Sequence, residues 1–365
     1  MRAWLEIDCD KLGRNVERVR AEIGSTVSLI AVVKTNAYGH GLPAVVQALD
    51  RPEVAMLAVA DADEAFRARQ VSRKPLLILG HTEQRELTYA IENGIIVSAY
   101  DKELLPLYER TAARLGQTMR VHVKVETGLN RLGMSLDEAT DFLTSKRHFP
   151  HVRVEGIYSH LADAPNPETD SVQLQRLQDL LVKIQGKCDV LPVHLGSSGA
   201  LGVFPAGYLD AVRVGGALYG LGSGLAGLEP IMTAKTVVIQ TRPVAAGEEV
   251  GYTPRFRAKT RLQLALLAIG YGEGLSVAYS GKMAVLLSGE KRPVIGRVAM
   301  NIIAVDATGL NVKRGDEAVV IGSQKDDHGQ TATLTVAELA KATGIRHYEV
   351  TTRLGASLPK FYQPR

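Results

Sequence analysis

The sequence has few cysteines, no long apolar run and no apolar leader. Cys9 and Cys188 are the only cysteines among 365 residues. Two cysteines are too few to cross-link a chain of this size, so a reducing compartment suits it best. The first eight residues, MRAWLEID, carry acids where a secretory signal needs an apolar core. No apolar run approaches the roughly 20 residues of a membrane-spanning helix. We therefore expect a cytoplasmic protein without a membrane partner.

Charge of one sign is not concentrated anywhere in the chain. The net charge of +4 is spread along the sequence, and aromatic residues, 5% of the total, are not interleaved with basic runs. Nucleic-acid binding therefore has no support. The contents of 45% hydrophobic and 22% charged residues are ordinary for globular proteins. The length is sufficient for two domains, each with its own core.

Short apolar segments alternate with helical patterns in the first two thirds of the chain. The segments that we expect to be strands are 29–33, 56–59, 76–79, 95–98, 121–125, 152–158, 191–194 and 211–214. Helical patterns lie between them, over 62–69, 102–115, 136–145 and 172–185 among others. Eight strands alternating with helices predict a (β/α)8 TIM barrel. A strand over 3–7 and a helix capped by Asp10 would precede it.

From about residue 230 the pattern becomes rich in β structure. We expect strands over 237–244, 261–269, 283–288, 294–304 and 316–321, with SGEK at 288–291 as a hairpin turn. Thr335 and Glu338 form a capping box for a helix that runs through Ala342 and ends at Gly344. The predicted fold is therefore α/β, with a barrel domain over 1–228 and a mainly-β domain over 229–365. The first strand, at about 3–8, is a candidate to pack with the β domain.

A lysine follows the first strand of the predicted barrel. The apolar run LIAVV at 29–33 is typical of a strand buried on both faces, and Lys34 comes directly after it. Desolvation lowers the pKa of an ammonium at such a position, which makes the amine nucleophilic enough to form a Schiff base. A lone lysine there would more often extend to solvent. The polar, glycine-containing stretch from Asn36 to Gly41 favours a functional site.

Two glycine-rich turns follow the seventh and eighth predicted strands. They are GSSG at 196–199 and GG at 215–216. In TIM barrels the loops after these strands often hold phosphate, because backbone N–H groups and hydroxyls can approach the dianion closely. Either turn alone would be a plain connection. Together they predict a phosphate site.

Residues 31–41, AVVKTNAYGHG, resemble the pyridoxal-phosphate attachment motif of bacterial alanine racemases, with Thr35 where that family more often has alanine. Further segments resemble family motifs in the same order: VHVKVETGLNRLG (121–133), YSH (158–160), VHL (193–195), DAVRVGG (210–216), VGYT (250–253), IGYGEG (269–274), GRVAMN (296–301) and IRHYEV (345–350). The resemblance implies a pyridoxal-phosphate-dependent isomerase that interconverts L- and D-alanine, a peptidoglycan precursor. It also implies a homodimer with shared active sites.

The resemblance also implies residue roles. Lys34 and Tyr252 would be the two catalytic bases, with Tyr252 reaching the site from the partner subunit, because proton exchange between two faces of Cα is served by two bases. Arg131 would approach the cofactor and the substrate carboxylate, a task that suits its fork of donors. Met300 and Tyr271 would also bind substrate. The other cofactor-binding residues would be Tyr38, His160, Ser198, Arg213, Gly215, Gly216 and Tyr348.

Arg213 matches the arginine that faces the pyridine nitrogen of the cofactor. A guanidinium can donate a hydrogen bond to that nitrogen but will not protonate it. The ring is then a weaker electron sink, which suppresses transamination. His160 and His194 resemble the histidines that link this arginine to the catalytic tyrosine. Lys124 matches a lysine that is carbamylated in some members, where the added charge orients the arginine at 131. No metal site is expected.

The chain departs from the family pattern at several positions. Ser197 replaces a common asparagine, Asn301 an aspartate, and Gly272-Glu273 the pair Ala-Asp. Asn301 removes a carboxylate beside the predicted substrate site, so a racemase of broader range or one that prefers serine is the nearest alternative. A non-catalytic pyridoxal-phosphate carrier would lack the β domain. A fold-related decarboxylase and a cofactor-free Schiff-base aldolase are the remaining alternatives.

Overall fold

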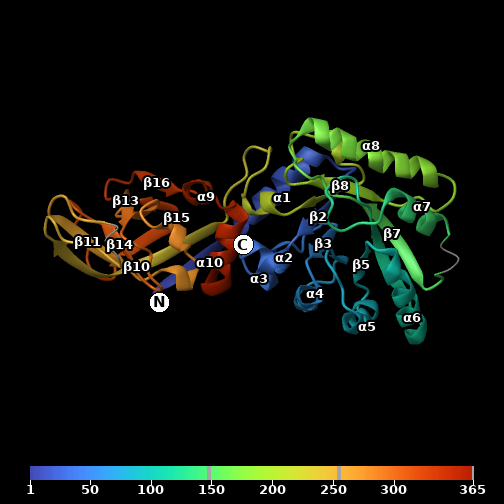
Figure 1. Cartoon of the computed structure of the whole chain (residues 1–365), viewed down its shortest axis with the longest axis horizontal. Coiled ribbons are helices and arrows are strands. Elements are labelled where there is room, and N and C mark those ends of the chain that lie inside the picture. The colour runs from blue at the N-terminus through green and yellow to red at the C-terminus, as the bar shows by residue number, and fades with distance from the viewer. Residues whose placement is uncertain (146–148, 253–255, 364–365) are drawn as a thin grey trace. The chain divides into compact units, whose positions relative to one another are not determined.

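The computed structural model describes residues 1–145, 149–252 and 256–363. The chain forms two compact units (Figure 1). The barrel unit comprises Leu12–Ala37 and Leu42–Glu229, and the β unit comprises Met1–Lys11, Tyr38–Gly41 and Pro230–Arg365. Within the described residues, no helix combines the length and the apolar character that crossing a membrane requires.

Eight parallel strands close into a barrel in chain order. They are β2 (Ser28–Val32), β3 (Met56–Val59), β4 (Leu76–Ile78), β5 (Ile96–Ala99), β6 (Met119–Lys124), β7 (Val152–Tyr158), β8 (Val193–Ser197) and β9 (Ala211–Val214). The pairing of β9 with β2 closes the ring. The predicted barrel is thus confirmed, and every strand end lies within three residues of its expected position.

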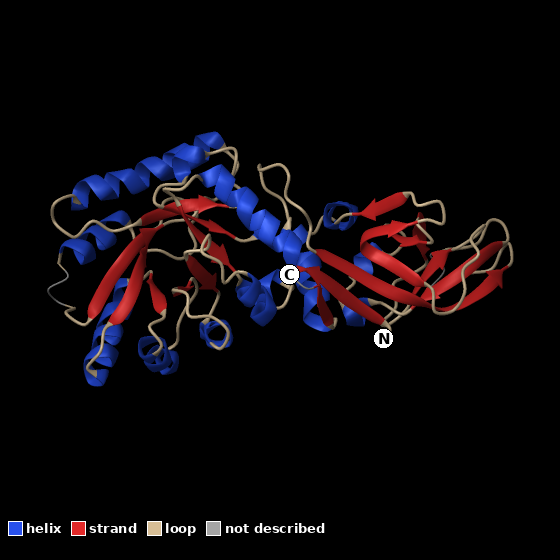
Figure 2. Cartoon of the chain, turned by 180° about the vertical axis from the view of Figure 1, so that it is seen from behind, coloured by secondary structure: helices blue, strands red, loops and turns tan. Residues whose placement is uncertain are grey.

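Helices precede, connect and follow the barrel strands and lie around the outside of the barrel (Figure 2). They are α1 (Cys9–Ile23), α3 (Leu42–Ala48), α4 (Ala62–Arg69), α5 (Gln84–Glu92), η1 (Lys102–Leu104), α6 (Leu105–Leu115), α7 (Leu136–Thr144), α8 (Pro167–Ile184), η3 (Pro205–Gly207) and η4 (Gly216–Tyr219). The expected cap at Asp10 is wrong. Helix α1 begins at Cys9, so Asp10 lies within its first turn, and the carboxylate of Asp8 accepts the Lys11 N–H at 2.8 Å. Asp8 therefore caps the helix.

The barrel strands are buried on both faces, as parallel strands covered by helices must be. Leu29, Ile30, Ala31 and Val32 of β2 are all buried, and so is every residue of β4. Complete burial of one Leu, Ile or Val side chain contributes about 1.5–3 kcal/mol. The uninterrupted apolar runs of the sequence are therefore what holds the carboxyl ends of the strands in place.

The β unit is built on a nine-stranded sheet in the order β16-β15-β12-β13-β14-β11-β10-β1-β17. The strands are β1 (Ala3–Asp8), β10 (Met232–Val244), β11 (Leu262–Leu267), β12 (Ala284–Leu287), β13 (Glu290–Ile295), β14 (Ile303–Asp306), β15 (Glu317–Lys325), β16 (Thr331–Leu334) and β17 (Lys360–Gln363). β1 pairs antiparallel with β10 and parallel with β17. The first and last strands of the chain therefore belong to one sheet.

Local signals in the β unit are confirmed where turn and cap chemistry is strong. Leu287 pairs with Glu290, which leaves Ser288 and Gly289 as a two-residue turn with φ of 54° and 78°. Helix α9 (Val336–Thr343) carries the Thr335–Glu338 capping box, and Gly344 ends it at φ 76°. Helix α10 (His347–Ser357) and the strands β16 and β17 were not predicted.

The single strand expected over 294–304 is wrong. β13 ends at Ile295, β14 begins at Ile303, and residues 296–302 form a loop between them. Gly296 has φ 69°, and a Cβ at this position would lie 2.7 Å from the Val250 carbonyl oxygen. The chain therefore turns away from the sheet at a position that only glycine fits. This loop carries Met300 and Asn301.

Candidate active site

Lys34 lies two residues beyond β2, at the carboxyl end of the barrel. Directly after it, Thr35, Asn36, Ala37 and Tyr38 have φ values of 55°, 52°, 54° and 54°. Left-handed backbone costs L-residues roughly 1–2 kcal/mol per residue. Four consecutive non-glycine residues in this region persist only if other contacts hold them.

Glu64 on α4 supplies such contacts. Its Oε1 accepts the Asn36 N–H at 2.6 Å and its Oε2 accepts the Ala60 N–H at 3.0 Å. Asn36 Oδ1 in turn accepts the Leu42 N–H at 2.8 Å and a bond from Arg67 Nη2 at 3.1 Å. The Glu64 carboxylate is buried, and burial raises its pKa. The sequence analysis did not single out Glu64, because only a buried acid on an amphipathic helix marks it.

The amines of two lysines at this end of the barrel have lowered pKa values. Burial lowers the pKa of Lys34 most, the positive charges of Arg131 and Arg213 lower it further, and Glu64 opposes them. Burial, Arg131 and Arg213 lower the pKa of Lys124 to about 8. Unprotonated amine is the form that attacks a carbonyl carbon. Lys34 therefore has the electrostatic setting of a Schiff-base lysine.

Arg213 on β9 is buried and bonded through both Nη groups. Nη1 donates to His194 Nδ1 at 2.8 Å and to the His194 carbonyl oxygen at 2.9 Å. Nη2 donates to His160 Nδ1 at 3.1 Å and to the carbonyl oxygens of Ser159 at 2.6 Å and Leu195 at 3.1 Å. Burial lowers the pKa of Arg213 to about 10, so the guanidinium stays charged at neutral pH. The structure thus brings Arg213, His160 and His194 together.

The ring of Tyr158, on β7, packs against His194, Arg213 and Lys124. Its ring stacks on His194 with centroids 5.0 Å apart and an interplanar angle of 1°. Arg213 Cζ lies 5.1 Å and Lys124 Nζ 5.6 Å from its centroid, within the range of cation–π attraction. The hydroxyl is 2.6 Å from Ser98 Oγ, and burial raises the pKa of Tyr158 to about 12. The sequence analysis quoted this tyrosine only as part of a motif.

Arg131 lies in a loop that Glu126 shapes. Glu126 Oε1 accepts the Gly128 N–H at 2.5 Å and Oε2 accepts the Arg131 N–H at 3.2 Å. A bridge between Val125 and Met134 closes the loop at its base. The acid after β6 therefore positions the backbone of the arginine.

The two glycine-rich loops after β8 and β9 are joined at Ser198. Its Oγ accepts the N–H groups of Gly215 at 3.1 Å and Ala217 at 3.2 Å. Residues 198–203, directly after β8, form successive turns. A 3₁₀ helix, η4, begins at Gly216. The hydroxyl and the backbone of both loops thus lie together at the carboxyl ends of neighbouring strands.

In the β unit, three other predicted segments lie next to one another. The Tyr271 N–H donates to the Ala299 carbonyl at 3.0 Å, and the Gly272 N–H donates to the Met300 carbonyl at 2.7 Å. A Cβ at Gly251 would lie 3.3 Å from the Arg297 nitrogen, which places the Tyr252 segment beside the same loop. Tyr252, Tyr271 and Met300 are 68%, 44% and 56% exposed. Thr253, in the same motif as Tyr252, lies outside the described residues.

Tyr38 and Tyr348 contact each other within the β unit. Their ring centroids are 5.4 Å apart with an interplanar angle of 71°. Burial raises the pKa of both hydroxyls. The backbone around Gly39 packs against Thr351 and Gly355 of α10, where neither glycine has room for a Cβ. The two tyrosines predicted to bind the cofactor therefore form one pair.

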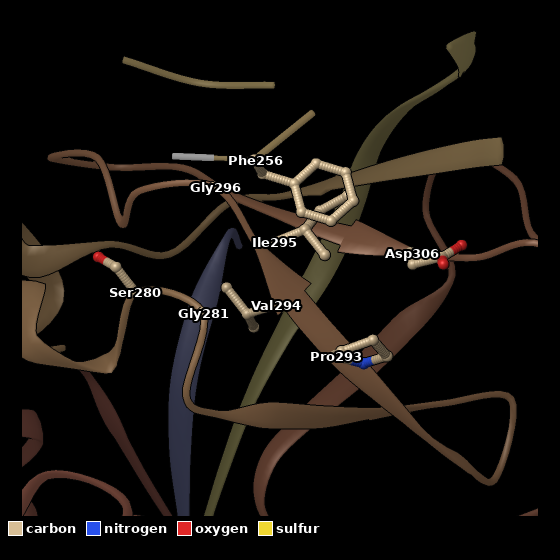
Figure 3. Close-up of a pocket in the computed structure, with 8 residues that line it drawn as sticks. All are labelled: Phe256, Ser280, Gly281, Pro293, Val294, Ile295, Gly296 and Asp306. Carbon is tan, nitrogen blue, oxygen red and sulfur yellow. The ribbon is translucent and has the colours of Figure 1, made fainter. Parts of the chain in front are cut away.

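A pocket of about 400 Å³ also lies in the β unit (Figure 3). It is lined by Phe256, Ser280, Gly281, Pro293, Val294, Ile295, Gly296 and Asp306. Its lining contains no lysine, so it cannot form a Schiff base, and none of the predicted site residues borders it. In the described ranges, no group of three or more His, Cys, Asp or Glu side chains could hold a metal ion.

Comparison with known proteins covers both units. Residues 7–223 match the family described as "Alanine racemase, N-terminal domain", and residues 231–362 match "Alanine racemase, C-terminal domain". The chain is 32% identical to alanine racemase of Syntrophobacter fumaroxidans, over 97% of this chain and 95% of the relative. It is also 32% identical to alanine racemase of Methanococcus maripaludis, over 98% of each chain.

Solved structures agree with these sequence matches. Alanine racemase from D-cycloserine-producing Streptomyces lavendulae superposes with a TM-score of 0.92 at 31% identity, covering 100% of this chain and 98% of that one. Alanine racemase from Bartonella henselae with covalently bound pyridoxal phosphate gives 0.87 at 26% identity, covering 100% of both chains. The matches extend over the barrel and the sheet alike, and the chain belongs to the alanine racemase family of isomerases.

Proposed function

We propose that the protein interconverts L- and D-alanine with pyridoxal phosphate covalently attached to Lys34. The observation that carries this proposal is the position of Lys34, just past β2 at the carboxyl end of the barrel. Burial and the charges of Arg131 and Arg213 lower the pKa of its amine there. The donor set suits an aldehyde that carries a phosphate and a phenolate, because it combines an amine, two guanidinium groups and the loops joined by Ser198. When bound, the cofactor supplies an electron sink that acidifies the Cα–H of an amino acid.

The residues that would hold the cofactor are Lys34, Tyr38, Arg131, His160, Ser198, Arg213, Gly215, Gly216 and Tyr348. Both Nη groups of Arg213 are engaged by protein acceptors. Nε–H is therefore the donor that we propose for the ring nitrogen. Since this guanidinium keeps its proton at neutral pH, it donates without protonating the ring. That property favours proton return to Cα over transamination.

We propose Lys34 and Tyr252 as the bases that hold and return the Cα proton on opposite faces. Tyr252 would come from the partner subunit of a homodimer. Tyr252, Tyr271, Met300 and Ile302 are exposed on adjoining loops of the β unit, and large apolar side chains gathered in this way favour coverage by a second copy of the chain. In this scheme residues 1–228 supply the cofactor-binding residues other than Tyr348, and the loops of Tyr252, Tyr271 and Met300 within residues 229–365 complete the partner's site.

Substrate binding falls to Arg131, Tyr271 and the backbone of Met300. The planar fork of Arg131 can hold a carboxylate through two parallel bonds. We propose that Lys124, whose pKa is about 8, orients Arg131 after carbamylation, since the reaction with carbon dioxide requires a free amine. We also propose that the protein is cytoplasmic, because its low cysteine content suits a reducing environment.

The test is racemisation in deuterated water. Purified protein loaded with pyridoxal phosphate receives L-alanine, and chiral chromatography with mass spectrometry follows the product. We expect D-alanine to accumulate to an equal mixture, with one solvent deuterium at Cα. Parallel incubations with L-serine and other L-amino acids decide between strict and broad specificity, and released carbon dioxide would reveal a decarboxylase. Absence of D-alanine would contradict the proposal.

A further inference from the structure

We propose that His122, on β6, is a positioning residue that fixes the tautomer of His194 and thereby the orientation of Arg213. The consequence for catalysis rests on the proposed racemase function. His122 is 3% exposed, and its Nδ1 lies 2.9 Å from His194 Nε2. The two rings are 5.1 Å apart between centroids. Arg213, His194 and His122 thus form a continuous hydrogen-bonded chain across β9, β8 and β6.

The chemistry of the guanidinium determines which atom donates and which accepts in the hydrogen bonds between Arg213, His194 and His122. All nitrogens of Arg213 are donors, so the bond between Arg213 Nη1 and His194 Nδ1 requires that Nδ1 accept. A neutral imidazole carries its one proton on the other nitrogen, which puts it on His194 Nε2. His194 Nε2 therefore donates to His122 Nδ1. His122 must in turn carry its own proton on Nε2.

The other tautomer of His194 is incompatible with this geometry. A proton on His194 Nδ1 would point at the N–H of Arg213 across 2.8 Å. A proton on both nitrogens would do the same and would add a second positive charge beside a buried guanidinium. Burial and the charge of Arg213 hold the pKa of His194 well below its usual range. Burial lowers the pKa of His122 to about 4, with Glu155 of β7 opposing and Arg213 and Arg120 reinforcing this change.

The barrel makes specific room for the His122 ring. Gly156 on β7 is paired with His122, and a Cβ there would lie 2.8 to 3.0 Å from three ring atoms. Glycine inside a strand is destabilising relative to alanine. This observation is independent of the hydrogen bonds. Strand β7 therefore has no side chain at the position where the His122 ring lies.

These hydrogen bonds restrict the orientation of the Arg213 guanidinium. His194 is held on one side by His122 and on one face by the ring of Tyr158, which is parallel to it. Nδ1 of His194 is then a fixed acceptor for Nη1. With Nη1 and Nη2 both anchored, the remaining Nε–H of Arg213 points in one direction. Loss of His122 would free His194 to take the other tautomer, and Nη1 would lose one of its two acceptors.

Direct detection of the ring protons tests the assignment without reference to activity. Long-range ¹H–¹⁵N correlation spectra of histidine-labelled protein, loaded with pyridoxal phosphate, distinguish the two tautomers. We expect both His194 and His122 as Nε2–H tautomers. A wild-type spectrum with the proton on His194 Nδ1 would overturn the proposal. The spectrum reads the same whether or not the protein racemises alanine, so failure of the proposed function would appear separately in the racemisation assay.

Two substitutions test the positioning role. His122→Asn places an acceptor oxygen where Nδ1 lies and should keep the His194 tautomer and most of the activity. His122→Leu removes the acceptor, and we expect kcat to fall about tenfold with little change in KM, as for loss of one hydrogen bond. Gly156→Ala, which displaces the ring, should resemble His122→Leu. Equal kcat values and unchanged His194 signals in all three variants would contradict the role.

Discussion

Asn301 Nδ2 donates to Glu273 Oε1 at 2.7 Å, so two positions that we predicted to depart from the family pattern contact each other. Glu273 Oε2 also accepts the Gly270 N–H at 2.8 Å, and a Cβ at Gly272 would lie 3.0 Å from Asn301 Nδ2. The glutamate, the glycine and the amide therefore form one arrangement. The pair joins the loop of Tyr271 to the loop of Met300.

This relationship predicts that Asn301→Asp is harmful although it restores the residue common in the family. Two carboxylates would face each other at this distance, and like charges in contact repel. We expect kcat/KM for alanine to fall by about tenfold, equivalent to about 1.4 kcal/mol. The double variant with Glu273→Gln should recover most of the loss, because an amide can again donate to a carboxylate. Additive losses in a double-mutant cycle would show that the pair is not coupled.

Removal of the Glu64 carboxylate should loosen the turn that follows Lys34. In Glu64→Ala the N–H groups of Asn36 and Ala60 lose their acceptor, and each buried unpaired group costs about 1–3 kcal/mol. We expect a lower free energy of unfolding, measured in urea, and weaker binding of pyridoxal phosphate. Asp63→Ala is the matched control, because Asp63 is exposed on the same turn of α4. Equal free energies of unfolding and equal binding of pyridoxal phosphate in the two variants would contradict the role of Glu64.

The buried histidines predict how stability depends on pH. The pKa of His122 is about 4 in the folded protein, below the ordinary 6.5 of an unfolded chain. Between these values the unfolded state binds more protons, so the free energy of unfolding decreases as pH falls from about 6.5 to about 4. His122→Asn should reduce this slope in urea unfolding, whereas His328→Asn, at an exposed position, should not. A slope unaffected by His122→Asn would contradict the assignment.

Tyr252→Phe tests the second base. The variant retains every group proposed to hold the cofactor, so the bound pyridoxal phosphate should keep its visible absorbance. Racemisation in both directions should fall by about 10²-fold or more, the usual contribution of a positioned acid or base. Tyr89→Phe, on helix α5, should leave the rate unchanged. A Tyr252→Phe enzyme with unaltered turnover would exclude the role.

The fold could be predicted where a buried strand appears in the sequence as a continuous apolar run. Continuous apolar runs predicted the eight barrel strands, since a barrel surrounded by helices buries both faces of its strands. The same signal misled at 294–304, where Val298, Met300 and Ile302 suggest a strand. Met300 and Ile302 are instead exposed, and the glycine at 296 turns the chain away from the sheet.

The candidate site was predicted from residues that belong to contiguous motifs. Lys34, Arg131 and Arg213 stand in such motifs, and the described contacts of Arg213 include both predicted histidines. Glu64 and His122 could not be found in this way. Glu64 lies 28 residues from Asn36 and His122 lies 72 from His194, and only the tertiary fold of the barrel unit brings each pair together.

The most direct test of the account is to locate the covalent attachment of the cofactor. Protein loaded with pyridoxal phosphate is reduced with borohydride, digested and mapped by mass spectrometry. We predict that the added phosphopyridoxyl group is found on Lys34, and that Lys34→Arg protein carries none. Attachment at Lys124 or any other lysine, or no added mass on Lys34, would contradict the central claim.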